Sequence, residues 1–136
     1  MTIYDLIDER PLTDPELVRT VLRDTLPGPG SGPELCFLLC DLNGHLLTPL
    51  LLRLDEIPVD PVTQRTVLDA TIGVGAPHVS AACCVVRHGP IHATPTDRLW
   101  QEAVQRYCQE QGIRDLGFFV MGTRGIDQLQ PLRLAA

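Results

Sequence analysis

Lysine is absent from this chain of 136 residues, and all eleven of its basic residues are arginine. The formal net charge is −6. Proteins that bind phosphate backbones use clusters of lysine and arginine, so this charge argues against nucleic acid as the main partner. Leucine, proline and alanine are abundant. Coding by a GC-rich genome therefore explains the missing lysine better than function does.

Long apolar runs are also absent. No stretch reaches the roughly 18 apolar residues that indicate a membrane-spanning helix. The first residues, MTIYDLIDERPL, are acidic and lack the basic region and apolar core of a signal peptide. Both observations predict a cytoplasmic protein that makes no contact with a membrane.

The cysteines are five in number and form no C-x-x-C motif. Four of them lie in strongly apolar runs, which in a cytosolic protein is typical of small buried side chains rather than of disulfides or metal ligands. A catalytic thiol needs an exposed, electropositive setting, and no such setting is evident. The cysteines are Cys36, Cys40, Cys83, Cys84 and Cys108.

The length is typical of one domain, and we expect residues 1–136 to form one. Thr13 and Glu16 have the spacing of a capping box and Pro15 suits a first turn, so a helix is predicted here. The stretch PGPGSGP, residues 27–33, predicts a linker between this helix and an α/β core over 34–136.

The core begins with a predicted β-hairpin. Residues 35–40 are continuously apolar, which is typical of a strand buried on both faces. Asn43-Gly44 is a strong hairpin signal, and residues 46–54 would form the partner strand. Pro49 interrupts that strand, which predicts an edge position or a bulge.

Helices and strands alternate in the rest of the chain. Asp60-Pro61 can begin a helix that runs to about Val74 and turns residues 62, 68, 71 and 72 inward. Residues 95–111 predict the best helix, with Gly112 as its C-terminal cap and residues 99, 100, 103, 104, 107 and 108 on its apolar face. Strands are predicted at 79–86, 116–121 and 126–134. This order predicts a three-layer α/β/α fold with a mixed sheet.

The stretch VVRHGPIHATPTDRLW, residues 85–100, lies where a predicted strand passes into a helix. Sites in open α/β sheets form at the carboxyl ends of strands. His88, His92 and Asp97 could supply three ligands to a zinc ion, which would leave one position for a reactive water. Glu34 would then be a possible base.

A second interpretation of the same stretch needs no metal. Thr94 can cap the helix, Pro95 suits its first position and Asp97 its third, next to the positive end of the helix dipole. Histidines in polar loops are usually solvated, and H-x3-H in a loop containing proline lacks the fixed geometry that it has on a helix.

Several motifs resemble, in order, those of the JAB/JAMM metalloprotease-like domain, especially its bacterial RadC branch. They are TDPELV before the core, GPELCFLLCDLNGHLL, AACCVVRHGP, ATPTDRLW and QGIRDLGFFVMG. The resemblance covers residues 11–131. It implies a cytidine-deaminase-like α/β/α fold in which a His-x-His pair and the Asp of Ser-x-x-Asp hold zinc, and a glutamate activates water.

Only part of that zinc site is present in this chain. Glu34 stands at the position of the family's early glutamate, and Thr94 with Asp97 matches Ser-x-x-Asp. His88 matches one histidine of the pair, but Val86 or Pro90 stands where the other would be. Because zinc sites normally have at least three protein ligands, the resemblance predicts the fold and no bound metal or cofactor.

Three functions follow from these observations. The first is a non-catalytic JAB/RadC-like domain that acts through a protein partner or as a homodimer. Its candidate contacts are leucines 46, 47, 50, 51 and 52, of which we expect about half to lie in the core because alternate residues of a strand face opposite ways. The second is a divergent zinc-dependent hydrolase of the peptidase or isopeptidase type, using His88, His92, Asp97 and Glu34. The third is a DNA-repair accessory factor, for which only arginines 87, 98, 106, 114 and 124 could form a basic patch.

Overall fold

The structure, a computed structural model, describes residues 11–26 and 32–134. The predicted linker falls largely outside the described residues, as do the first ten residues of the chain. Two short 3-10 helices, η1 (Leu54–Glu56) and η2 (Ile72–Gly75), lie before and after helix α3 in the chain. The main elements are α2 (Pro15–Thr25), β1 (Glu34–Asp41), β2 (Leu46–Arg53), α3 (Pro61–Ala70), β3 (Val79–Val86), α4 (Pro95–Gln111), β4 (Arg114–Gly122) and β5 (Gly125–Leu129).

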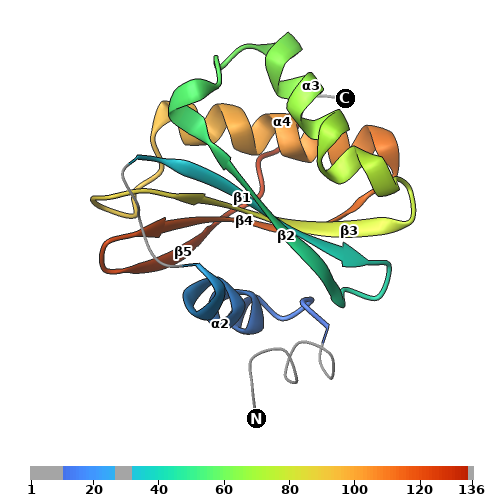
Figure 1. The fold of residues 1–136 in the computed structure, drawn as a ribbon, viewed down its shortest axis with the longest axis horizontal. Helices are drawn as coiled ribbons and strands as arrows, with labels where there is room; N and C mark the ends of the chain where they lie inside the picture. Colours follow the sequence, from blue (N-terminus) through green and yellow to red (C-terminus); the bar gives the residue numbers. More distant parts are fainter. Residues whose placement is uncertain (1–10, 27–31, 135–136) are drawn as a thin grey trace.

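The five strands form one mixed sheet in the order β2-β1-β3-β4-β5. β3 and β4 run parallel and are joined through α4, whereas the other neighbouring pairs are antiparallel. Helix α2 lies against one face of the sheet, and α3 and α4 cover the other (Figure 1). The predicted mixed α/β fold with helices on both faces is therefore confirmed.

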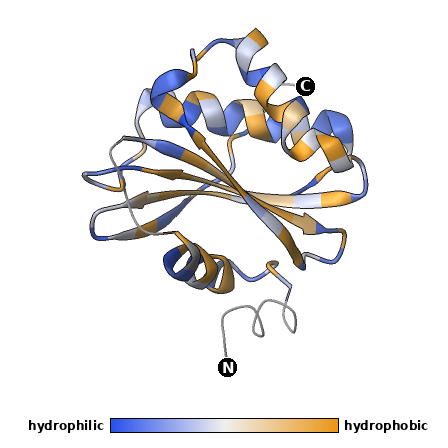
Figure 2. Ribbon diagram, in the orientation of Figure 1, coloured by the Kyte–Doolittle hydropathy of each residue, from blue (hydrophilic) through white to orange (hydrophobic). Residues whose placement is uncertain are grey.

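A separate apolar core lies on each face of the sheet. Leu35 and Phe37 of β1 pack on the side of α3 and α4, and the alternate residues Cys36 and Leu38 pack on the side of α2. All eight residues of β3 are buried. Figure 2 shows the resulting pattern, with apolar strands at the centre of the molecule and polar residues on the outer surfaces of the helices. The prediction of strands buried on both faces is confirmed for β1 and β3.

Helix α2 begins one residue later than the capping-box spacing predicts. Its N-cap is Asp14, whose Oδ1 accepts a hydrogen bond from the backbone N–H of Glu16 at 3.0 Å. The prediction of a cap at Thr13 is wrong because Asp14 directly precedes Pro15, and its carboxylate suits the positive end of the helix dipole.

Helix α3 begins as predicted, with the Asp60 side chain accepting from the backbone N–H of Thr63. It ends at Ala70, not near Val74 as predicted, and the chain continues as η2. The Thr71 hydroxyl donates to the carbonyl of Val67 at 2.8 Å. The backbone N–H of Thr71 donates to the carbonyl of Leu68 at 3.3 Å, the spacing of a 3-10 turn, so the α-helical hydrogen-bond pattern stops here.

Two predicted inward positions are exposed. Val62 of α3 is 77% exposed and Leu99 of α4 is 49% exposed, whereas Leu68 and Ile72 are buried. The inward side of α3 carries Gln64 and Leu68, and Val62 lies off this stripe because each residue turns about 100° around the axis. The other inward predictions hold, since residues 71, 100, 104, 107 and 108 are buried and Ala103 is half-buried.

The edge strands depart from regular pairing. β2 is an edge strand, as Pro49 predicted, and its register shifts at Leu47, between the partners of Leu39 and Cys40, whereas Pro49 itself pairs regularly with Leu38. Its side chains alternate, so Leu47 and Leu51 are exposed and residues 46, 50 and 52 are half-buried. At the other edge, β5 is shorter than the predicted strand 126–134 because side chains of α4 bind the residues that follow it. Gln101 donates to the carbonyl of residue 130, and Gln105 makes two hydrogen bonds with the backbone of residue 132.

None of the helices within residues 11–26 and 32–134 combines the length and apolar character that a membrane-spanning helix needs.

Candidate functional site

The loop between β3 and α4 is organised around the side chain of Arg87. The guanidinium of Arg87 forms an ion pair with the carboxylate of Asp97 in the first turn of α4. It also donates to the backbone carbonyl of His92 and, at 3.5 Å, to that of Pro90. One arginine at the end of β3 thus holds two carbonyls of the loop and the start of the next helix.

Asp97 is a structural part of the helix start. It is 3% exposed, and its Oδ2 accepts the backbone N–H of Thr94 at 2.9 Å as well as the guanidinium of Arg87. In return, the Thr94 hydroxyl accepts the backbone N–H of Asp97 at 3.1 Å. The capping box predicted for Thr94 and Asp97 is therefore confirmed, and its buried carboxylate has a cationic partner.

The other predicted site residues do not complete a metal site. His88 and His92 are exposed in the loop. Glu34 is half-buried at the start of β1 and pairs in register with Val86, so it lies at the same end of the sheet. Within the described ranges, no group of three or more histidine, cysteine, aspartate or glutamate residues is placed to hold a metal ion. The structure therefore does not assemble His88, His92 and Asp97 as a ligand set.

The far side of the same loop is fixed to the turn between β4 and β5. The backbone N–H of Gly89 donates to the Thr123 hydroxyl at 2.9 Å, and the N–H of Thr123 donates to the carbonyl of Gly89 at 3.0 Å. A Cβ at Gly122 would lie 2.6 Å from that carbonyl, so only glycine fits there. A cavity of about 410 Å³ lies beside this contact and is lined in part by His92 and Arg124.

The cysteines are buried free thiols, as predicted. Burial raises the pKa of Cys36, Cys40 and Cys108 to about 12. Burial likewise raises the pKa values of Cys83 and Cys84. Because the thiolate is the nucleophile, none of the five is set up for catalysis near neutral pH.

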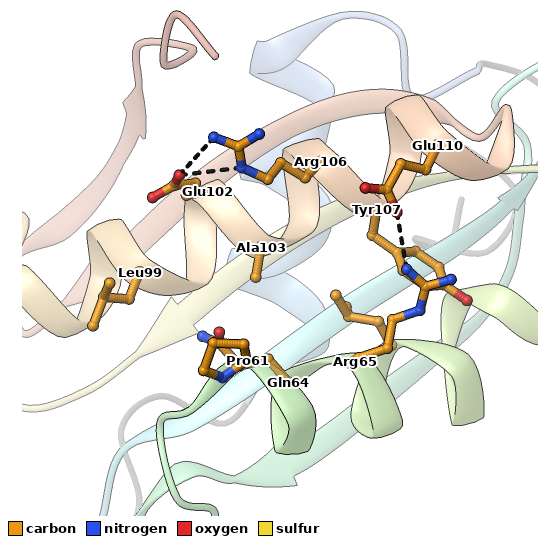
Figure 3. A pocket seen from close by; sticks show the side chains of 10 residues that line it. Pro61, Gln64, Arg65, Leu99, Glu102, Ala103, Arg106, Tyr107 and Glu110 are labelled. Atoms are coloured by element: carbon orange, nitrogen blue, oxygen red, sulfur yellow. Dashed lines mark hydrogen bonds and ion pairs between the residues drawn. The ribbon is translucent and has the colours of Figure 1, made fainter. Parts of the chain in front are cut away.

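A groove between α3 and α4 is the feature that the sequence prediction missed (Figure 3). It has a volume of about 450 Å³. Its residues recur at helical spacing on both helices, but only the packing of the two helices brings them together. They are Pro61, Gln64, Arg65 and Leu68 of α3, and Leu99, Glu102, Ala103, Arg106, Tyr107 and Glu110 of α4.

One end of the groove is closed by a network around Tyr107. The Tyr107 hydroxyl donates to Oδ1 of Asp69 at 2.6 Å, and the guanidinium of Arg65 lies 4.9 Å from the centre of the ring. Arg65 also forms an ion pair with Glu110 at 2.9 Å, which Figure 3 shows crossing between the helices. Burial, and then the hydrogen bond to Asp69, raises the pKa of Tyr107 to about 12.

Gln64 lines this groove and carries a polar atom that is closed off from solvent. The residue is 7% exposed and lies between the two helices (Figure 3). Among the described residues, the Nε2 of Gln64 has no hydrogen-bond partner. Most buried polar groups in folded proteins have one, so this donor is a feature that requires an explanation.

Two of the five arginines considered for a basic patch are already neutralised. Arg87 is paired with Asp97, and Arg106 with Glu102 at 3.0 Å. A guanidinium with a carboxylate partner contributes less to phosphate binding than a free one. The pairing of Arg87 and Arg106 therefore argues further against a nucleic-acid-binding surface.

The chain matches no protein-family model, and a search of the curated proteins finds no significant relative.

Proposed function

We propose that the chain is a non-catalytic, JAB/RadC-like domain of a cytoplasmic protein and that it acts through protein–protein contacts. The observation that carries this proposal is the pairing of Arg87 with Asp97. Asp97 is the carboxylate that matches the family's zinc ligand. Here its carboxylate binds a side-chain cation, at the place where the family resemblance implies a metal ion.

The positive charge of Arg87 disfavours the binding of zinc at Asp97. A divalent cation at Asp97 would meet a guanidinium already in contact with the same carboxylate, and the two like charges would repel. Zinc bound by His88 and His92 alone would lack the three protein ligands that such sites normally have. The mixed sheet between helical layers suits the JAB/RadC-like architecture, and the altered ligand set suits a domain that has lost hydrolysis.

Protein contacts are the function that the remaining surface favours. Exposed apolar side chains occur on β2, at Leu47 and Leu51, and in the groove, at Leu99. The net charge of −6 disfavours binding to the phosphate backbone of nucleic acid. A second copy of the chain is one partner that would satisfy the proposal, and sedimentation over a range of concentrations would reveal it.

The test is the metal content of protein purified without chelator from zinc-supplemented medium. We expect much less than one zinc per chain, with no difference between the wild type and His88→Ala or Asp97→Asn. One zinc per chain that is lost in His88→Ala would contradict the proposal and favour the zinc-dependent hydrolase.

A further inference from the structure

We infer that the cavity between the β3–α4 loop and the β4–β5 turn binds a small monocarboxylic acid with an apolar body, whose carboxylate pairs with Arg124. The ligand is a small molecule, so this inference goes beyond the protein–protein contacts proposed above and does not depend on them.

The cavity lies where open α/β sheets usually hold their ligands. The parallel strands β3 and β4 end at Val86 and Gly122, and the cavity is lined by residues 89–92 and 123–124, which follow these two ends. Ligands of such sheets bind in the crevice beyond the carboxyl ends of the strands. The volume of about 410 Å³ lies in the range of roughly 300 to 1000 Å³ that is usual for ligand sites.

The walls of the cavity are held in place by the protein itself. Two hydrogen bonds join Gly89 to Thr123, and the guanidinium of Arg87 holds the carbonyl of His92. Ile91 packs closely on Gly122, since a Cβ on that glycine would lie 2.8 Å from the Cγ2 of the isoleucine. A ligand would therefore lose little binding free energy to the ordering of the loop.

The lining of the cavity favours a ligand with an apolar body. Pro90 and Ile91 both line it, the first exposed and the second half-buried. An aliphatic chain placed against these side chains would remove their apolar surface from water, at about 0.8 kcal/mol for each buried CH₂ group. A body of a few carbon atoms is therefore enough to add measurably to the affinity.

Arg124 supplies a permanent positive charge that the ligand can match. It lines the cavity, it is exposed, and no carboxylate of the described residues forms an ion pair with it. The arginines of the groove between α3 and α4 differ, because Arg65 is paired with Glu110 and Arg106 with Glu102. A guanidinium can donate two parallel hydrogen bonds to a carboxylate. One carboxylate balances this charge, whereas a phosphate dianion would bring an excess negative charge to a chain whose net charge is already −6.

The test follows the backbone amide signals of the full chain by NMR during titration with three probes at constant ionic strength. With sodium hexanoate we expect saturable shifts around Gly89, Ile91 and Thr123. Hexan-1-ol keeps the apolar body without the charge, and sodium acetate keeps the charge without most of the body. Each of these two probes should bind at least about tenfold more weakly than hexanoate.

Arg124→Met and Arg114→Met form a matched pair, since both arginines are exposed and only Arg124 lines the cavity. We expect Arg124→Met to weaken hexanoate binding about tenfold and to leave hexan-1-ol binding unchanged. Arg114→Met should change neither. Equal affinities for hexanoate and hexan-1-ol, equal losses in the two variants, or shifts that do not saturate would overturn the inference. Hexanoate shifts centred on the exposed leucines 47, 51 and 99 instead of the cavity would also overturn it.

Discussion

Arg87, the residue after β3, and Asp97, in the first turn of α4, form an ion pair that joins the end of the strand to the start of the helix. The side chains are 15% and 4% exposed, respectively. The same guanidinium holds the carbonyl of His92. The crossover loop therefore takes its shape from this pair.

Arg87→Met should destabilise the protein by roughly 2 to 4 kcal/mol, because it leaves the buried carboxylate of Asp97 without its cation. Denaturant unfolding measures this loss. Hydrogen exchange should also become faster in residues 88–94. Arg124→Met, at an exposed position in the β4–β5 turn, is the comparison and should change stability by about 0.5 kcal/mol or less. Similar losses in both variants would show that the ion pair has no special role.

Gln64→Leu should stabilise the free protein by about 1 kcal/mol, because it removes a buried donor that has no partner among the described residues. Gln101→Leu should do the opposite and cost roughly 1 to 3 kcal/mol, since its Nε2 donates to the carbonyl of Gln130 at 2.8 Å. Both glutamines are buried in the layer of α3 and α4. Thermal or urea unfolding of the two variants checks the difference, and a loss in Gln64→Leu would mean that its amide is satisfied in the folded protein.

Asp60 should make stability depend on pH in the acid range. Hydrogen bonds from the backbone N–H and hydroxyl of Thr63 hold the pKa of Asp60 below its usual value. The folded state thus favours the ionised form. Its contribution is present above the unfolded pKa of about 4 and is lost as the pH falls through the lower folded value.

Asp60→Ser keeps an N-cap oxygen but removes the ionisable group, so it separates capping from charge. Urea midpoints at a series of acid pH values should fall less steeply in Asp60→Ser than in the wild type. Parallel curves for the two proteins would contradict the lowered pKa of Asp60.

The five cysteines should resist alkylation by iodoacetamide in the folded protein at mildly alkaline pH. Burial raises their pKa values, to about 12 for Cys36, Cys40 and Cys108, so little thiolate forms and the reagent has no access. Mass spectrometry should find the native protein nearly unmodified and the urea-unfolded protein labelled at all five. Rapid labelling of a single cysteine in the native protein would reveal a reactive thiol that this structure does not predict.

The strands and the best helix were predictable because their signals are local. Continuous apolar sequence marks β1 and β3, and Thr94, Pro95 and Gly112 mark the ends of α4. The end of α3 was not predictable in this way. At that end the backbone N–H of Thr71 donates to the carbonyl of Leu68, and a Cβ on Gly73 in η2 would lie 2.0 Å from the hydroxyl oxygen of Tyr107 on another helix.

The candidate metal site and the groove between α3 and α4 also depend on contacts between distant parts of the chain, which local sequence signals do not predict. The loop residues His88, His92 and Asp97 stand out in the sequence, but the partner of Asp97 is set by how the loop folds back on Arg87. The groove depends on the packing of two helices far apart in the chain. Leu99 belongs to an apolar stripe that predicts burial, yet it is 49% exposed at the groove between α3 and α4.

We propose above all that the guanidinium of Arg87 occupies the position beside Asp97 where the family resemblance implies a metal ion. Calorimetric titration of zinc into the purified wild-type chain at neutral pH tests this claim most directly. We predict no saturable one-to-one binding, and the same weak heats for wild type, His88→Ala and Asp97→Asn. Tight one-to-one binding in the wild type that is lost in both variants would contradict it.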